Sequence, residues 1–217
     1  LLPLPKTDPA PDTGGSLRRD STWYVLAEKA EHLHFNLPMK GVRFAYDLRI
    51  CDSSGDVVWE TAQTVESGAR YEQKDFSLEV RLPRLGLYRF DFNAGEDYSP
   101  FFPAGMKAVL EISEPNHPML RFFGGAFYVP ENTDRILLKT DGRFTIAAPG
   151  WKSRKEYTAA DEDRAMGCIV IPVGNGAGKI WTVDKNSSGR TYFLNIPPYL
   201  AQGPERALVP AECLEKA

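Results

Sequence analysis

The sequence predicts an all-β fold made of two tandem antiparallel β-sandwich domains. Polar and apolar residues alternate in several segments, most clearly at residues 42–50, as in strands that bury one face. Glycine- and proline-rich turns separate these segments at short intervals, which is typical of sandwiches and barrels. With 18 glycines and 17 prolines, no stretch sustains a helical period, and residues 157–166 are the one candidate for a short helix or, equally, a loop.

Strands of the first half are expected at residues 23–26, 32–37, 42–50, 57–60, 76–82, 86–92 and 106–112. In this strand pattern the first half resembles a generic immunoglobulin-like or fibronectin-like sandwich. Pro38 is expected to close the second of these strands, because proline cannot donate to a sheet ladder. Asp52 to Asp56 are turn residues and predict a hairpin between the third strand and the fourth.

A cluster of strand-breaking residues near the middle of the chain predicts a domain boundary. It comprises Glu114, Pro115, Asn116, His117 and Pro118. We therefore expect domain 1 at residues 20–114 and a jelly-roll-like domain 2 at residues 115–217. Strands of the second half are expected at residues 122–130, 135–139, 143–147, 168–173, 179–184 and 191–196. The glycine-rich residues 174–179 lie between two of these strands and predict a hairpin turn, not a phosphate loop that precedes a helix.

Residues 1–19 have the composition of a linker. Pro3, Pro5, Pro9 and Pro11 are followed by Gly14 and Gly15, a pattern that is semi-rigid and then flexible. We expect neither a helix nor a central strand in this segment. Because the chain begins with Leu1 and not with methionine, the segment is expected to follow something upstream.

Composition excludes several classes of partner. The formal net charge of −3 gives no electrostatic footprint for nucleic acid, and the apolar runs are too short to span a membrane. The three cysteines, Cys51, Cys168 and Cys213, form no C-x-x-C pair, which argues against a zinc site. Their disulfide state stays open, and buried thiols are favoured over one bridge.

No catalytic motif is recognisable, so we expect a chain that is not an enzyme. There is no nucleophile elbow, no H-E-x-x-H helix motif and no Walker loop. His32 and His34 share one face of a strand, but a metal needs a third ligand, and a polar strand face is favoured. Acidic groups fall at Glu96-Asp97 and at Asp161-Glu162-Asp163. They match no calcium loop motif, so no cofactor is expected and calcium on these loops is the alternative.

Aromatic residues at turns are the strongest sign of a ligand. One group, at Tyr98, Phe101 and Phe102, lies in a proline-flanked loop. The other follows the turn Pro149-Gly150 and predicts a ligand site made of Trp151, Lys152, Arg154, Lys155 and Tyr157. Aromatic rings stack on the apolar faces of sugars while polar side chains bind the hydroxyls, and the three cations favour an acidic glycan. The alternative is that Trp151 packs under the loop and closes the end of the sandwich.

The second half resembles accessory β-sandwich domains appended to secreted bacterial enzymes, such as carbohydrate-binding modules and pre-peptidase C-terminal-like domains. The resemblance is carried by residues 127–130, 135–139, 144–150, 169–174, 178–183 and 192–198, a succession of strands and proline turns. It implies a non-catalytic module that binds a polysaccharide or acts as a spacer. It also implies an upstream catalytic domain in the same chain and a secreted, periplasmic or cell-surface location.

Two other functions stay open, and each has a structural discriminator. A polysaccharide-cleaving enzyme could use loop carboxylates or a tyrosine with an arginine or lysine, and would show a cleft with a perturbed carboxylate pair. An envelope or protein-interaction module would present a long, uncharged edge strand. Exposure of Trp151 or Phe101 on a groove would support carbohydrate binding instead.

Overall fold

The computed structural model describes residues 1–3, 16–18, 20–41, 43–66, 72–94, 97–98, 100, 102–103, 105–114, 119–121, 123–185 and 189–213. The fold is all-β, as the sequence predicts, with several antiparallel sheets and helical structure confined to short 3-10 turns. Within the described ranges, no helix has the length and apolar character needed to cross a membrane. The immunoglobulin-like and jelly-roll-like assignments of the two halves stay predictions.

The larger of the two main sheets has ten strands, and every pairing in it is antiparallel. Its spatial order is β15 (Lys155–Tyr157), β14 (Phe144–Ala147), β17 (Lys179–Lys185), β12 (Gly124–Val129), β19 (Tyr199–Ala201), β10 (Lys107–Glu111), β3 (Ser21–Ala27), β8 (Gly86–Ala94), β5 (Arg43–Cys51) and β6 (Val57–Glu66). Strands of the second half thus occupy one side of the sheet, and strands of the first half the other.

The second main sheet has eight strands and the same division. Its order is β16 (Ile169–Pro172), β13 (Arg135–Thr140), β18 (Gly189–Phe193), β11 (Met119–Arg121), β2 (Ser16–Arg18), β9 (Asp97–Tyr98), β4 (Glu31–Gly41) and β7 (Glu72–Leu82). The first four strands belong to the second half of the sequence, and the other four to the first half.

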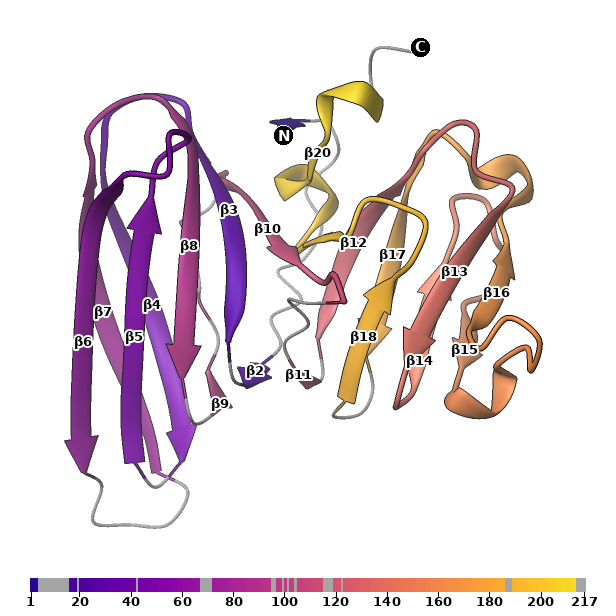
Figure 1. Ribbon diagram of the computed structural model, residues 1–217, viewed down its shortest axis with the longest axis horizontal. Helices are drawn as coiled ribbons and strands as arrows, with labels where there is room; N and C mark the ends of the chain where they lie inside the picture. The colour runs from indigo at the N-terminus through magenta and orange to yellow at the C-terminus, as the bar shows by residue number, and fades with distance from the viewer. Residues whose placement is uncertain are drawn as a thin grey trace.

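The two halves are joined by strand pairing in both sheets. In the larger sheet β10 pairs with β19, and in the smaller sheet β11 pairs with β2. Figure 1 shows the two groups of strands side by side. The predicted domain boundary at residues 114/115 stays a prediction, since residues 115–118 lie outside the described ranges. The described strands of the two halves do not interleave, yet each main sheet contains strands of both halves.

One hydrophobic core fills the space between the two sheets along both halves. In the first half it contains aromatic pairs such as Phe35 with Phe90, and in the second half Phe127 with Phe193. The inward residues alternate with outward polar ones, because side chains on a strand point to opposite faces in turn. The alternation of residues 42–50 is the clearest case: Phe44, Leu48 and Ile50 are buried.

The end of the chain forms a third layer on the larger sheet, between the two halves (Figure 1). After β19, the 3-10 turn η3 (Pro204–Arg206) and β20 (Leu208–Val209) pack Ala207 and Leu208 against Val109 of β10. Strand β1 (Leu2–Pro3) pairs with β20. The buried side chains of Arg206 and Gln202 donate hydrogen bonds to the carbonyls of Phe102 and Pro100, at 3.2 and 2.9 Å. The C-terminal segment therefore anchors a loop of the first half.

The expectation that residues 1–19 contain no central strand is wrong where these residues are described. Ser16–Arg18 form β2, which lies between β11 and β9, and Leu17 is fully buried. A three-residue strand is too short to show alternation, so its partners determine it rather than its own pattern. Pro38 does not close its strand either: β4 continues to Gly41, and Pro38 is opposite Asp75 of β7.

Residues 157–166, expected to be a short helix or equally a loop, form no α-helix; Thr158 caps a 3-10 turn, η1 (Ala159–Asp161), through a capping box with Asp161. One further local expectation is wrong. The glycine-rich residues 174–179 connect two strands but not as a hairpin, because β16 belongs to the smaller sheet and β17 to the larger one. The 3-10 turn η2 (Gly174–Gly176) makes this crossing between sheets.

The burial of Leu17 predicts that β2 is needed for stability. Leu17→Ala should lower the free energy of unfolding by roughly 2–5 kcal/mol, since it removes a fully buried side chain. The matched control Leu85→Ala, at a position 71% exposed, should change it by less than about 0.5 kcal/mol. Urea unfolding measures both, and equal effects would show that β2 is not part of the core.

Candidate functional site

The predicted ligand site lies at the outer edge of the larger sheet, on the hairpin of β14 and β15. Trp151 is in the turn between these strands, where its N–H donates to the carbonyl of Ala148 at 3.1 Å and Gly150 takes a positive φ of 83°. Phe144 is opposite Tyr157 and Ile146 is opposite Lys155 in the strand register. Since Phe144 and Ile146 are buried, Lys155 and Tyr157 share the inner face at the rim of the core.

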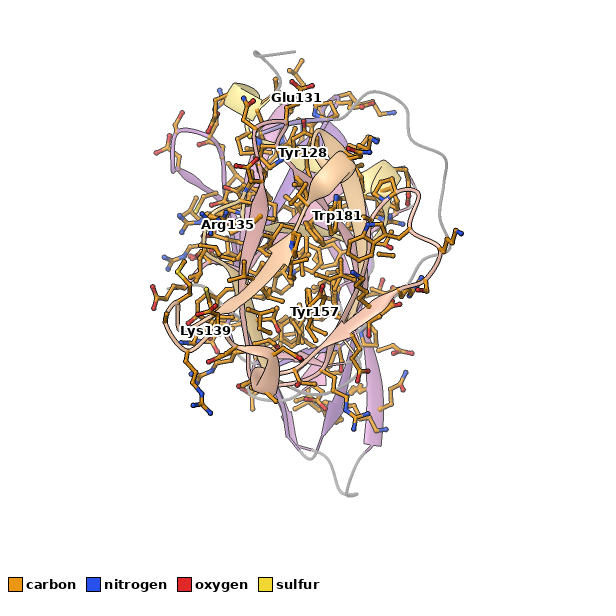
Figure 2. All side chains as sticks on the ribbon, turned by 90° about the vertical axis from the view of Figure 1, so that its right-hand side faces the viewer. Tyr128, Glu131, Arg135, Lys139, Tyr157 and Trp181 are labelled. Atoms are coloured by element: carbon orange, nitrogen blue, oxygen red, sulfur yellow. The ribbon has the colours of Figure 1, made fainter. Side chains whose placement is uncertain are left out.

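Trp151 packs onto Trp181 rather than standing free. The two rings meet edge to face, with centroids 5.1 Å apart. Trp181 is fully buried, and its indole N–H donates to the carbonyl of Gly176 at 2.8 Å. A Cβ at Gly176 would lie 2.6 Å from the Trp181 ring, so only glycine permits this contact. Figure 2 looks onto this end of the sandwich and labels Trp181 and Tyr157.

The neighbouring charged residues are partly used within the protein. The ammonium group of Lys155 lies 4.7 Å from the centre of the Trp151 ring, a cation–π contact. Arg154 forms an ion pair with Asp184 on β17. Lys152 is exposed. Burial, with a smaller contribution from Asp161, raises the pKa of Tyr157 above its ordinary value, as expected for a half-buried ring packed on the core.

The structure thus brings all five predicted residues onto one hairpin, but Trp151 is half-buried and covered by Lys155 over its ring. A sugar that stacked on Trp151 would have to displace this lysine. This packing agrees with the alternative given above, in which Trp151 covers the end of the sandwich instead of binding a ligand. A ligand site at this hairpin stays a prediction.

The other aromatic loop is largely core. Tyr98 and Phe102 are buried, and Phe102 packs against Trp23, Phe35 and Phe90. Phe101 lies outside the described residues, as does Glu96. This loop therefore offers no exposed aromatic platform in the part that the structure describes.

The histidines face a carboxylate across the sheet. His32 Nδ1 and His34 Nε2 lie 3.7 and 3.6 Å from Glu79 on β7, and all three side chains are exposed. Throughout the described ranges, no group of three or more His, Cys, Asp or Glu residues is arranged to hold a metal ion. His117 lies outside the described residues. No disulfide joins the three cysteines, all of which lie in the described ranges, and Cys51 and Cys168 are buried.

A second candidate site, which the sequence did not indicate, is a hollow of about 680 Å³ on the outer face of the larger sheet. Strands β3, β8, β5 and β6 form its floor. Polar side chains of these strands, together with Asp20 just before β3, line it, namely Asp20, Thr22, Asp47, Arg49, Glu60, Asp91 and Asn93. Strand pairing fixes their order, because Asp91 is opposite both Thr22 and Arg49, and Arg49 is opposite Glu60.

Hydrogen bonds and ion pairs organise the floor of this hollow. Thr22 donates to Asp91 at 2.9 Å, and the Arg89 guanidinium binds the other oxygen of the same carboxylate at 2.6 Å. Arg49 lies 3.7 Å from Glu60. Four acids and one arginine line the hollow, so the formal charge of its lining is −3, of which Arg89, bound to Asp91, offsets one charge. A carboxylate or sulfate ligand would be repelled there, whereas neutral hydroxyls or an ammonium group would be accepted.

One edge of this face is bounded by a tyrosine and glutamate pair. Tyr24, the next outward residue of β3 after Thr22, donates to Glu111 of β10 at 3.2 Å. Its ring packs edge to face on Tyr199 of β19, with centroids 5.7 Å apart. Burial, followed by the charges of Glu111 and Tyr199, raises the pKa of Tyr24 to about 12. Tyr24 is therefore a neutral hydrogen-bond donor at neutral pH.

Asp52 has a structural role at the neighbouring hairpin turn. Its burial acts to raise the pKa, but hydrogen bonds from Ser54, Arg84 and Asp56 outweigh this and hold the pKa below its ordinary value. The carboxylate thus stays ionised and organises the turn between β5 and β6.

Comparison with family models, with curated proteins and with solved structures finds no match to this chain. What the two candidate sites can bind therefore has to be inferred from their own geometry.

The packing of Trp151 predicts that it contributes to stability. Trp151→Ala should lower the free energy of unfolding by roughly 1–3 kcal/mol, less than for a fully buried ring, because one edge rests on Trp181. Lys152→Ala, in the same turn but exposed, should change it by less than about 0.5 kcal/mol. If both variants unfold at the wild-type urea concentration, Trp151 is free and available for a ligand.

The raised pKa of Tyr24 predicts a loss of stability at alkaline pH. The unfolded phenol ionises near pH 10 and the folded one near pH 12, so the neutral phenol stabilises the folded state below pH 10 and this contribution is lost as the pH rises towards 12. Tyr24→Phe cannot ionise, so its unfolding free energy should fall less steeply across this interval. Urea titrations at several pH values compare the two proteins, and identical slopes would contradict the assignment.

Proposed function

We propose that this chain is a non-catalytic β-sandwich module that binds carbohydrate in the hollow on the outer face of the larger sheet. The hollow carries the proposal because it combines carboxylate, amide, hydroxyl and guanidinium groups on one surface. Planar polar groups of this kind bind neighbouring sugar hydroxyls in pairs. Its volume, about 680 Å³, lies in the range of small-molecule sites.

The rigidity of the floor supports this proposal. The polar groups project from four neighbouring strands of one sheet, with the register Thr22–Asp91–Arg49–Glu60 across it. Such groups are held in place before the ligand arrives, which lowers the entropic cost of binding. Since the formal charge of the lining is −3, we propose neutral or amino sugars as ligands of the hollow. An acidic glycan would instead be expected at Trp151, Arg154 and Lys155.

A spacer role is a second candidate, favoured by the continuity of both sheets through the two halves. A module of this kind keeps its two ends at a fixed separation.

In either case we propose that this module serves a polysaccharide-active catalytic domain upstream in the same chain, in a bacterial protein that is secreted or lies at the cell surface. Support for this setting comes from the resemblance to accessory domains and from the linker-like composition of residues 4–15.

Isothermal titration with neutral, amino and acidic oligosaccharides tests the proposal. Neutral or amino sugars should bind with a dissociation constant of roughly millimolar to micromolar. Asp91→Ala should weaken binding by at least about tenfold, because it removes the group at the centre of the floor. The matched control Asp75→Ala, on β7 of the other sheet, should bind like the wild type.

Other outcomes separate the candidates. If the wild type binds none of the sugars, or if Asp91→Ala binds as tightly as the wild type, the hollow is not the ligand site. Binding of acidic oligosaccharides alone, lost in Trp151→Ala but retained in Asp91→Ala, would instead place the ligand at the β14–β15 hairpin.

A further inference from the structure

The edges of the two sheets differ in how they are protected from pairing with another strand. Strand β15 has three residues, and β16 has four and ends in Pro172. Strand β7 is long but carries Lys74, Asp75, Glu79 and Arg81. Short strands, proline and charged side chains are the usual means by which natural sheets avoid association at their edges.

Strand β6, the fourth edge, is less protected: it is long, contains no proline, and its charged residues are Glu60 and the terminal Glu66. It has ten residues and forms the end of the larger sheet, pairing with β5 on one side. From Val57 to Val65 the one charged residue is Glu60. Valine, tryptophan and threonine, which favour strands, make up more than half of this segment. Val57 is 49% exposed, and Val58, Trp59 and Val65 are only partly covered by the core.

We propose that β6 pairs antiparallel with β6 of a second copy of this chain, so that the larger sheet continues across a two-fold axis. The sequence of β6 is self-complementary in this arrangement. Trp59 and Val65 share the inner face with Ile50 and Phe44 of β5, their register partners. A two-fold axis perpendicular to the sheet keeps inner residues opposite inner residues.

Two registers place Glu60 opposite an uncharged residue, although the one centred on Thr61 also places Glu66 opposite Asp56, which precedes β6. Centred on Ala62, Trp59 lies opposite Val65 and Glu60 opposite Thr64. Centred on Thr61, Glu60 lies opposite Ala62 and Val57 opposite Val65. By contrast, a register centred on Glu60 would place this acid opposite itself, which is unfavourable. Aromatic and β-branched side chains opposite each other are favourable pairs, so both registers cover the exposed apolar edge.

The smaller sheet, which packs on the larger one, is compatible with this pairing. On β7, which forms the adjoining edge of the smaller sheet, the charged residues Glu72, Lys74, Asp75, Glu79 and Arg81 sum to −1. Two such edges that approach each other therefore carry little net charge, and acids and bases are both available to pair. The pairing would also bring the two hollows to the same face on either side of the axis, because Glu60, Thr61 and Ala62 line each hollow.

Sedimentation velocity over a range of concentrations tests the proposal with substitutions at the exposed Ala62. The wild type and Ala62→Gln should form dimers. Ala62→Glu has nearly the same size as Ala62→Gln but places acids opposite each other in both registers. It should therefore weaken dimerisation by roughly tenfold or more. Circular dichroism and thermal unfolding confirm that each variant is folded.

A lysine at the same position identifies the register. In the Thr61-centred register Ala62→Lys meets Glu60 and should tighten the dimer relative to Ala62→Gln, whereas in the Ala62-centred register two lysines meet and should weaken it. A wild type that stays monomeric at all concentrations overturns the proposal. So does a dimer that is equally stable in the glutamine, glutamate and lysine variants. Because oligomeric state is measured without any sugar, failure here leaves the carbohydrate proposal standing, and the reverse also holds.

Discussion

The pairing of β10 with β19 is the contact on which the arrangement of the molecule depends. Strand β10 pairs on one side with β3 of the first half and on the other with β19 of the second. The C-terminal segment then folds over this junction, where Ala207 and Leu208 cover Val109. The halves are therefore connected by backbone hydrogen bonds and by apolar packing, and not by the chain alone.

This continuity has a consequence for the candidate ligand site. The floor of the hollow is part of a sheet that is fixed at one side by the second half and open at β6 on the other. Side chains that project from paired strands keep their spacing, so Thr22, Asp91 and Arg49 form a constant pattern. A site built on such a surface gains its selectivity from spacing and charge rather than from enclosure.

Much of the fold could be predicted from alternation alone. Long strands such as β5 and β8 bury every second residue, and the period is visible over their whole length. Short strands such as β2, β9 and β11 could not be predicted, because two or three residues show no period and are strands only through their neighbours. The turn at Pro149-Gly150 before Trp151 was predicted, whereas strand β15 was not, and the packing of Trp151 on Trp181 depends on a contact thirty residues away in the sequence. The hollow could not be predicted from single strands, because it forms where outward residues of neighbouring strands, such as Asp47 and Asp91, come together.

Because both sheets contain strands of the two halves of the sequence, we expect the halves to fold and unfold as one unit. The four tryptophans report on it directly, since Trp23 and Trp59 lie in the first half and Trp151 and Trp181 in the second. Fluorine NMR of protein labelled with 5-fluorotryptophan follows each of them separately during urea unfolding. If the halves unfold together, all four native signals should disappear with one midpoint and one slope. Loss of the Trp151 and Trp181 signals at a different urea concentration from those of Trp23 and Trp59 would show two independent domains and contradict this expectation.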